Sequence, residues 1–391
     1  MLHTLAISNY RSLLELVIPL SSVNVITGPN GSGKSNLYRA LKLLASTSDN
    51  GVVNALAAEG GLQSTFWAGP AVLSASMKRG DVPIEGTASR NGPMRLRMGF
   101  AGDDFGYAIS LGLPPKSDNP GMTRFALDPE IKRETIWAGS KYRPASTLVD
   151  REGAIVKVRQ GRSWNVIEQH MPRFESMFAR SLDVSAAPEL VALKEEIRSW
   201  RFYDHLRTDS EAPARQPQLG TRTPVLDDDG QALAAAWQTI IEIGDHDALN
   251  EAVDDAFPGA RVSVEVSADN RFTLAFQQEG LLRPLTAAEL SDGTLRFLLW
   301  VAALLTPRPP PLMILNEPET SLHPDLLPAL GRLITRASAD SQIWVVTHAP
   351  RLVNTLAKCD DFNEIRLEKT LGQTQVLDQP MFDQPPWHWP D

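Results

Sequence analysis

The octapeptide GPNGSGKS at residues 28–35 constrains this chain more than any other segment. It fills every fixed position of the pattern G-x-x-x-x-G-K-[ST]. A short β-rich run at residues 23–27 precedes it, and residues 35–45 follow with leucines at helical spacing. Glycines allow successive backbone N–H groups to converge on phosphate oxygens, and a helix N-terminus adds positive potential there. The sequence therefore predicts a phosphate-binding loop between a strand and a helix, in an α/β fold.

Two side chains of this loop have predicted chemical roles. We expect the Lys34 ammonium to neutralise the β- and γ-phosphates of ATP and to take part in catalysis. We expect the Ser35 hydroxyl to bind Mg²⁺. The residues expected to surround the phosphates are Gly28, Pro29, Asn30, Gly31, Ser32, Gly33, Lys34, Ser35 and Asn36. ATP and Mg²⁺ are thus the predicted cofactors.

The C-terminal part of the chain alternates between helical and strand patterns, which is typical of a parallel sheet with crossover helices. The expected elements are Asp292–Leu305, Leu312–Asn316, Pro324–Ala339, Gln342–Thr347 and Pro350–Ala357. The first strand is followed by Glu317, a carboxylate that can take a proton from an attacking water. The second is followed by His348, whose imidazole can hydrogen-bond a γ-phosphate. Glu317 and His348 are therefore candidate catalytic residues.

The patterns divide the chain into three segments. Residues 1–160 hold the phosphate loop and antiparallel strands, residues 161–260 form a helical insertion, and residues 261–391 hold the alternating elements. The expected strands include 2–9, 14–20, AVLSASMK (71–78), MRLRMGF (94–100), FGYAISLGL (105–113) and a pair about a turn near Glu152–Gly153. Helices are expected within 165–256, most clearly at Pro188–Asp204 and Gly230–Ile243, with a hairpin of Arg261–Val266 and Arg271–Gln277 after them.

Composition narrows the function classes. The net charge of −9 excludes a generic nucleic-acid binder, because any such contact would need a local basic patch. Basic residues and aromatic residues mix at 194–222, but we interpret that stretch as packing with solvated charges, and the nine tryptophans as packing residues. The single cysteine, Cys359, excludes a disulfide within the chain. With no signal-peptide pattern and no long apolar run, a soluble, cytoplasmic protein is expected.

Six motifs together resemble the ABC-type ATPase heads of the RecF/SMC/OLD group. They are NYRS (9–12), GPNGSGKS as Walker A, LSDG (290–293) as the signature, LMILNEPE (312–319) as Walker B, SLHP (321–324) as the D-loop and Thr347–His348 as the H-loop. The resemblance covers roughly residues 1–60 and 285–370. More closely, the chain resembles a family of bacterial single-chain AAA-type ATPases that have neither a long coiled coil nor a Toprim domain.

This resemblance implies a fold and a mechanism. The fold would be a P-loop NTPase head with an N-terminal antiparallel β lobe, a parallel-sheet core and a helical insertion. Two subunits would sandwich ATP, so that Ser291 and Gly293 of one subunit contact the γ-phosphate held by the other. Glu317 would be the general base and His348 a γ-phosphate contact. Further residues implied at the nucleotide are Arg11 and Ser12, and Ser321 and His323 would lie at the dimer seam.

One departure from the group's pattern bears on the reaction. Walker B ordinarily ends in Asp-Glu, whereas this chain has Asn316–Glu317. An amide oxygen is a weaker partner for Mg²⁺ than a carboxylate, so Asn316 as a metal-site residue predicts slow turnover. Glu319 is an alternative source of the missing charge, two residues further along.

Four functions remain open from the sequence. An ATP-driven switch that acts on DNA, in DNA metabolism or in defence against foreign DNA, follows from the resemblance. A regulatory ATPase with a separately encoded protein effector fits the acidic charge. The ATPase subunit of a membrane transporter is disfavoured by the long insertion, so no membrane partner is expected. A binding-only protein is motivated by Asn316.

Overall fold

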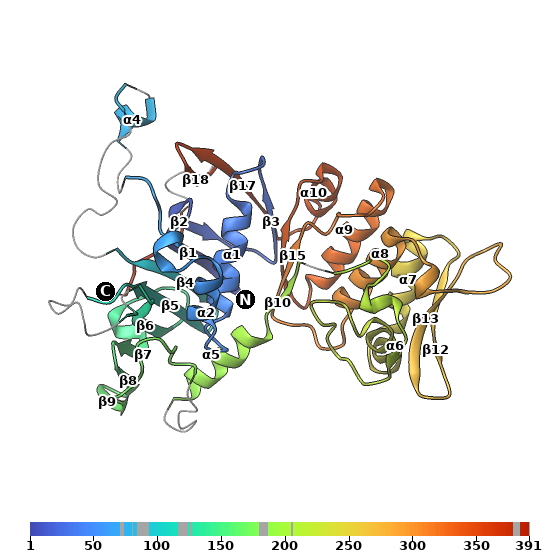
Figure 1. The fold of residues 1–391 in the computed structure, drawn as a ribbon, viewed down its shortest axis with the longest axis horizontal. Coiled ribbons are helices and arrows are strands. Elements are labelled where there is room, and N and C mark those ends of the chain that lie inside the picture. The colour runs from blue at the N-terminus through green and yellow to red at the C-terminus, as the bar shows by residue number, and fades with distance from the viewer. Residues whose placement is uncertain are drawn as a thin grey trace. The chain divides into compact units, whose positions relative to one another are not determined.

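The computed structural model describes residues 1–70, 74–79, 81–83, 94–115, 124–125, 127–179, 187–204, 206–377 and 384–390. The chain forms two compact units, and each unit is built from segments that are separated in the sequence (Figure 1). The first unit is built from Met1–Leu20, Thr27–Ser199 and Ile365–Asp391, and the second from Ser21–Ile26 and Trp200–Glu364. The three segments expected from the sequence are consecutive, whereas these units take residues from both ends of the chain.

An eight-stranded antiparallel sheet is the centre of the first unit. Its strands, in spatial order, are β2 (Leu13–Pro19), β1 (Leu2–Tyr10), β4 (Leu96–Gly102), β5 (Phe105–Gly112), β6 (Glu130–Ala138), β7 (Thr147–Glu152), β8 (Ile155–Gln160) and β9 (Ser163–Glu168). The helices of this unit are α1 (Lys34–Ala45), α2 (Val52–Ala58), α3 (Leu62–Thr65), α4 (Ala75–Arg79) and α5 (Pro188–Ser199). The predicted antiparallel β lobe is therefore present.

A fully buried ion pair lies inside this β lobe. The Arg151 guanidinium donates to Glu134 at 2.6 Å, and both side chains are fully buried. Glu134 also accepts hydrogen bonds from the Tyr107 hydroxyl (2.8 Å) and the Ser176 hydroxyl (2.6 Å). Burial, reinforced by the Glu134 charge, raises the pKa of Tyr107 well above its usual value. These bonds compensate the cost of burying two charges.

The second unit contains the predicted parallel sheet. Its strands lie in the order β10 (Arg201–Tyr203), β15 (Leu312–Asn316), β16 (Gln342–Val346) and β3 (Val23–Thr27), and every neighbouring pair is parallel. β17 (Phe362–Thr370) comes next in the strand order, leads the chain back to the first unit and pairs there with β18 (Gln373–Val376). β15 and β16 are buried almost throughout, as expected for central parallel strands.

Five α-helices and a small antiparallel sheet complete the described part of the second unit. The helices are α6 (Leu233–Ile243), α7 (His246–Ala256), α8 (Asp292–Leu304), α9 (Leu327–Ala337) and α10 (Pro350–Leu356). The small sheet has β11 (Gln218–Leu219), β13 (Arg271–Gln277) and β12 (Arg261–Val266), and β14 (Leu285–Thr286) pairs with β13. Leucines and alanines of α6, α8 and α9 share one apolar core with Val23 and Val25 of β3. None of the described helices is long and apolar enough to span a membrane.

Three local predictions were wrong. The helix expected at Pro188–Asp204 ends at Ser199, and Arg201–Tyr203 is a strand instead, because pairing beside β15 buries Tyr203 completely. The segment from residue 165 was expected to be helical, but it begins within strand β9. A two-residue turn joins β9 to β8, and the two strands pair as an antiparallel hairpin. AVLSASMK was expected to be a strand, but Ala75–Arg79 is helix α4; its first three residues lie outside the described residues.

Candidate functional site

The P-loop has the backbone shape that phosphate binding requires. Gly28, Gly31 and Gly33 have φ angles of 141°, 79° and 111°, which side-chain-bearing residues rarely adopt. Helix α1 begins at Lys34 directly after Gly33, and none of the described side chains caps its first turn. Uncapped N–H groups at a helix N-terminus form a ready anion site. The Ser32 hydroxyl is buried without a hydrogen-bond partner among the described residues, which leaves a polar atom available to a ligand.

The Lys34 side chain lies across the start of this loop. Its ammonium donates to the carbonyl oxygens of Gly28 (2.7 Å) and Pro29 (3.0 Å), and the residue is only 6% exposed. These bonds hold the cation at the loop, where a phosphate would approach the uncapped N–H groups. The geometry therefore fits the predicted binding of an ATP phosphate chain.

A network of hydroxyl groups supports the P-loop from the first unit. The Thr374 hydroxyl of β18 donates to the Ser32 carbonyl oxygen at 2.7 Å. It is also 2.7 Å from the Ser12 hydroxyl, which accepts a hydrogen bond from the Asn36 side chain at 2.8 Å. Ser12 and Asn36 thus meet beneath the loop, as neighbours of the predicted nucleotide site. Arg11, in contrast, forms an ion pair with Glu59 at 2.9 Å.

Two loop glycines are required by close contacts as well as by their φ angles. A Cβ atom at Gly33 would lie 2.1 Å from the Thr374 hydroxyl oxygen, and one at Gly28 would lie 2.3 Å from the Leu367 carbonyl oxygen. Both distances are far below van der Waals contact. The segment that ends in Thr374 therefore fixes the loop's path, and no sequence pattern indicated that role.

The second unit brings the two predicted catalytic residues together. β15, β16 and β3 are in register, with Asn316 opposite Val346 and Val346 opposite Ile26. Glu317 therefore follows β15 and His348 follows β16 at one edge of the sheet. The His348 Nε2 atom lies 3.7 Å from the Glu317 Oε1 atom, and both side chains are partly exposed. This distance is longer than a hydrogen bond, so the carboxylate and the imidazole interact through their charges when His348 is protonated.

The backbone at Glu317 is held in an unusual conformation. Its φ angle is 48°, in the left-handed region, while its N–H donates to the Val346 carbonyl oxygen at 2.8 Å. Ser321, four residues on, also has a positive φ of 66°. Left-handed residues other than glycine are strained and gather at functional sites. The strain thus falls on two residues for which the sequence predicted roles.

Glu319 has a structural task that the sequence did not indicate. Its Oε1 atom accepts hydrogen bonds from the Thr347 hydroxyl and from the His348 N–H, both at 2.7 Å. The side chain therefore connects the end of β16 to the segment after β15.

Asn316 has a different environment, because it lines a cavity of about 510 Å³ together with Glu317, Arg207 and Arg296. Burial lowers the pKa of Arg296, whose Nε atom has no partner among the described residues.

The predicted signature residues form a separate surface cavity in the second unit. Ser291 caps the N-terminus of α8 by accepting a hydrogen bond from the Thr294 N–H. A cavity of about 640 Å³ is lined by Ser291, Gly293, Ser321 and His323, among others. A Cβ atom at Gly293 would lie 2.8 Å from the Ser321 carbonyl oxygen, so the D-loop can approach α8 only at a glycine. The predicted signature and D-loop residues are therefore neighbours.

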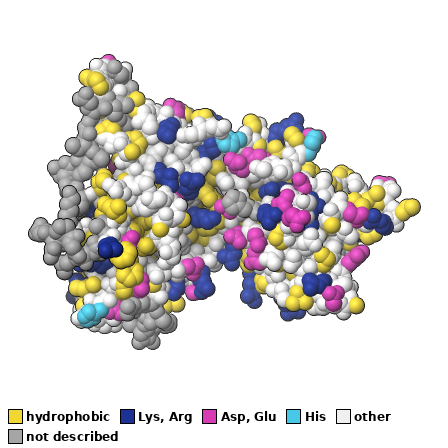
Figure 2. Space-filling model, viewed as in Figure 1, with side chains coloured by type: hydrophobic (Ala, Val, Ile, Leu, Met, Phe, Trp, Pro, Cys, Tyr) yellow, Lys and Arg dark blue, Asp and Glu magenta, His cyan; other side chains and the backbone are white. Residues whose placement is uncertain are grey.

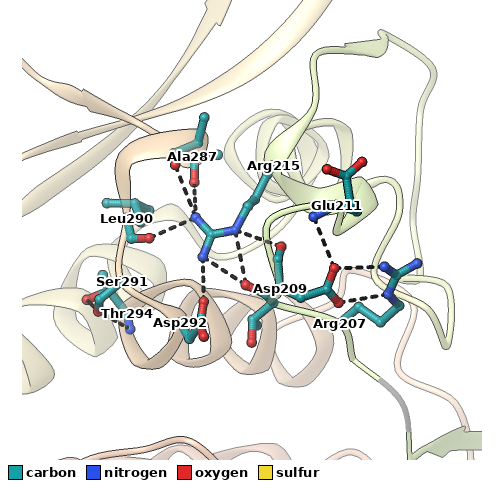
Figure 3. A network of polar contacts seen from close by, with 11 residues as sticks. Arg207, Asp209, Glu211, Arg215, Ala287, Leu290, Ser291, Asp292 and Thr294 are labelled. Atoms are coloured by element: carbon teal, nitrogen blue, oxygen red, sulfur yellow. Dashed lines mark hydrogen bonds and ion pairs between the residues drawn. The ribbon is translucent and has the colours of Figure 1, made fainter.

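A buried arginine holds the signature segment in place. Figure 3 shows the Arg215 guanidinium at the centre of a network that joins two loops. It donates to the carbonyl oxygens of Thr208, Asp209, Ala287, Ala288 and Leu290 and to the Asp292 carboxylate, at 2.7–3.3 Å. The residue is only 7% exposed. Arg215 was expected among the solvated charges of residues 194–222, and its buried role was missed, since nothing in the local pattern marks this residue.

Comparison with known proteins identifies the family and the fold of the chain. The family described as "AAA domain, putative AbiEii toxin, Type IV TA system" matches residues 23–354. An SMC head bound to the C-winged helix domain of ScpA is similar in structure, with a TM-score of 0.51 and 14% sequence identity over 97% of this chain and 98% of that one. The SMC head domain from Thermotoga maritima gives 0.50 and 14%, over 97% and 99%. No curated protein matches the chain. The chain therefore belongs to this AAA-domain family and has the P-loop ATPase fold of SMC heads, as its motifs predicted.

Proposed function

We propose that this protein binds ATP through Gly28–Ser35 and hydrolyses it slowly, with Glu317 as the general base. The observation that carries the proposal is the register of the parallel sheet. Ile26, Val346 and Asn316 lie opposite one another, and the chain continues from each strand end directly into the P-loop, His348 and Glu317. Parallel α/β sheets hold their ligands at the carboxyl ends of the strands.

The residues divide the chemical work as follows. Lys34 and the N–H groups at the start of α1 hold the phosphates. Glu317 takes the proton of the attacking water, and His348, 3.7 Å away, orients that carboxylate or contacts the γ-phosphate. Mg²⁺, held by Ser35 and by Asn316, would neutralise charge on the phosphates. Because Asn316 supplies an amide in place of a carboxylate, we expect turnover to be slow.

Phosphate release by Glu317→Gln tests the assignment of the base. The variant keeps the side chain's size but cannot accept the proton, so we expect hydrolysis to fall by about 10²–10⁴-fold while ATP binding persists. Lys34→Ala is expected to lose ATP binding itself. The matched control is Glu279→Gln, an exposed carboxylate outside all six motifs and 38 residues before Glu317. Unchanged phosphate release in Glu317→Gln would exclude this residue as the base.

We further propose that ATP joins two copies of the chain. Ser291 and Gly293 line the surface cavity with Ser321 and His323, the residues that the resemblance to ABC-type heads places at a dimer seam. ATP that binds both copies links association to nucleotide binding. The mass of Glu317→Gln with ATP, by light scattering, tests this step. We expect a dimer with ATP and a monomer without it, and a monomer in both conditions would exclude the nucleotide-dependent dimer.

The purpose of such a switch has two candidates. The first is a switch that acts on DNA, in DNA metabolism or in defence against foreign DNA, and it follows from the resemblance to the RecF/SMC group. The family description also names a toxin of a type IV TA system. The alternative is a regulatory ATPase with a protein partner. It is favoured by the head that was solved with a domain of ScpA. ATPase stimulation by DNA distinguishes the two.

A further inference from the structure

Unpaired basic side chains gather at one end of the β lobe. Most basic side chains of the second unit are ion-paired, and Figure 2 shows Lys and Arg interspersed with Asp and Glu over its elements. In the first unit, the loop between β6 and β7 and the β8–β9 hairpin differ. They carry Lys141, Arg143, Lys157, Arg159 and Arg162, and none of these five forms an ion pair among the described residues. We call them the hairpin cations.

Strand register places the hairpin cations on one end of the sheet. β6 ends and β7 begins at the same end as the β8–β9 turn, because consecutive strands are antiparallel. The Arg159 guanidinium donates to the Pro144 carbonyl oxygen at 3.4 Å, which joins the hairpin to the β6–β7 loop. Asp150 lies opposite Lys157, but its carboxylate is already bound by Arg133 and by the Thr135 hydroxyl. The local charge is therefore positive in a chain of net charge −9.

An exposed tryptophan stands among these cations. Trp164 is 42% exposed, although tryptophans were expected to be packing residues. It lies opposite Arg159 in the register, and the Arg159 guanidinium is 5.9 Å from the centre of its ring. Trp164, Tyr142 and Lys157 line a cavity of about 470 Å³ with Asp150 and Arg133. An aromatic face beside unpaired cations is the combination that binds a base and its flanking phosphates.

We propose that the β8–β9 hairpin binds single-stranded nucleic acid, with a base on Trp164 and phosphates on the hairpin cations. A single strand is favoured over a duplex because only unstacked bases can reach an aromatic side chain. This inference rests on the proposed function in one respect: the nucleic acid would be the partner on which the ATP-driven switch acts. Binding itself needs no ATP and is therefore measured without it.

Fluorescence anisotropy of labelled oligo(dT) and oligo(U), each about 15 nucleotides long, tests the proposal. We expect binding by the wild type and a loss of about tenfold or more in Trp164→Ala. In the double variant Lys157→Gln, Arg162→Gln, we expect the slope of log K against log salt to become shallower by about 1.4. The matched controls are Phe174→Ala, an exposed aromatic residue of the same unit, and Lys358→Gln, an exposed cation of the other.

The outcomes separate this inference from the proposed ATPase. A preference between oligo(dT) and oligo(U) would assign the strand as DNA or RNA, and either supports the proposal. Equal binding of a duplex or of polyglutamate, or unchanged affinity in Trp164→Ala, would overturn it. If Glu317→Gln and Lys34→Ala leave oligonucleotide binding intact but wild type hydrolyses no ATP, only the ATPase proposal fails.

Discussion

At the scale of single residues, Gly33 links the P-loop to a strand from the other end of the chain. Its φ of 111° and the Thr374 hydroxyl leave no room for a side chain. We therefore expect Gly33→Ala to weaken ATP binding by about tenfold or more, measured by isothermal titration calorimetry. The matched control is Gly153→Ala, which has a φ of 59° but open space around it. That control is expected to cost only about 1–2 kcal/mol of stability. Equal loss of ATP binding in both variants would contradict the contact argument.

Arg215 gives a second prediction at this scale. Lysine keeps its charge but cannot make the same fork of hydrogen bonds to the signature segment. We expect Arg215→Lys to fold, to bind ATP normally at the P-loop and to lose most ATP-dependent dimerisation, measured by light scattering. Arg222→Lys is the matched control, because Arg222 is 74% exposed and its one ion pair among the described residues is with Glu242 at 3.6 Å. Normal dimerisation of Arg215→Lys would show that the signature segment holds its shape without this network.

At the scale of elements, the buried Arg151–Glu134 pair holds β6 to β7. Arg151→Met leaves an uncompensated carboxylate in the β lobe, so we expect a loss of about 3–5 kcal/mol in the free energy of unfolding. Arg332→Met removes one partner of an exposed pair with Asp255 and is expected to cost about 1 kcal/mol or less. Urea denaturation followed by circular dichroism compares the two. Similar losses in both would mean that burial does not decide the cost here.

The sequence predicted those elements whose pattern is local. β15, β16, α8 and the β12–β13 hairpin occur within a residue or so of their predicted bounds, because periodicity and turn residues specify them. β10 lies where the sequence predicts the end of a helix, because three residues carry too little periodicity to indicate a strand beside β15. β6, β17 and β18 were not predicted either. β6 pairs with β7, the next strand in the chain, and β17 pairs with β18 across the two-residue turn Leu371–Gly372, so local turn signals were present and were missed.

The same distinction applies to the candidate site. The P-loop residues, Glu317, His348 and Ser291 follow from motifs, because each motif specifies a short stretch of backbone. Thr374 and Arg215 contact groups that are far away in sequence, and only the fold brings those groups close. The local basic patch that the composition argument required was also missed, since its cations are spread over more than twenty residues.

At the scale of the whole molecule, neither compact unit is a continuous piece of chain. A fragment of residues 1–199 lacks β18, and with it the Thr374 contacts to Ser12 and Ser32. A fragment of residues 200–391 lacks β3, the neighbour of β16. We expect neither fragment alone to show a cooperative thermal transition by circular dichroism, and we expect the co-expressed fragments to recover one. A cooperative transition in either fragment alone would show that the unit folds without its distant segment.

The position of β3 also has a consequence for biosynthesis. Ile26 is synthesised before its partner Val346, which follows it by 320 residues. At roughly 5–20 residues per second, β3 waits for about 16–64 s before the neighbouring strand exists. During that interval an apolar strand has no sheet to join, and exposed strands of this kind are prone to aggregate. The yield of active protein in a cell is therefore expected to depend on chaperones that shield the nascent chain. This dependence follows from the order in which the paired strands are synthesised.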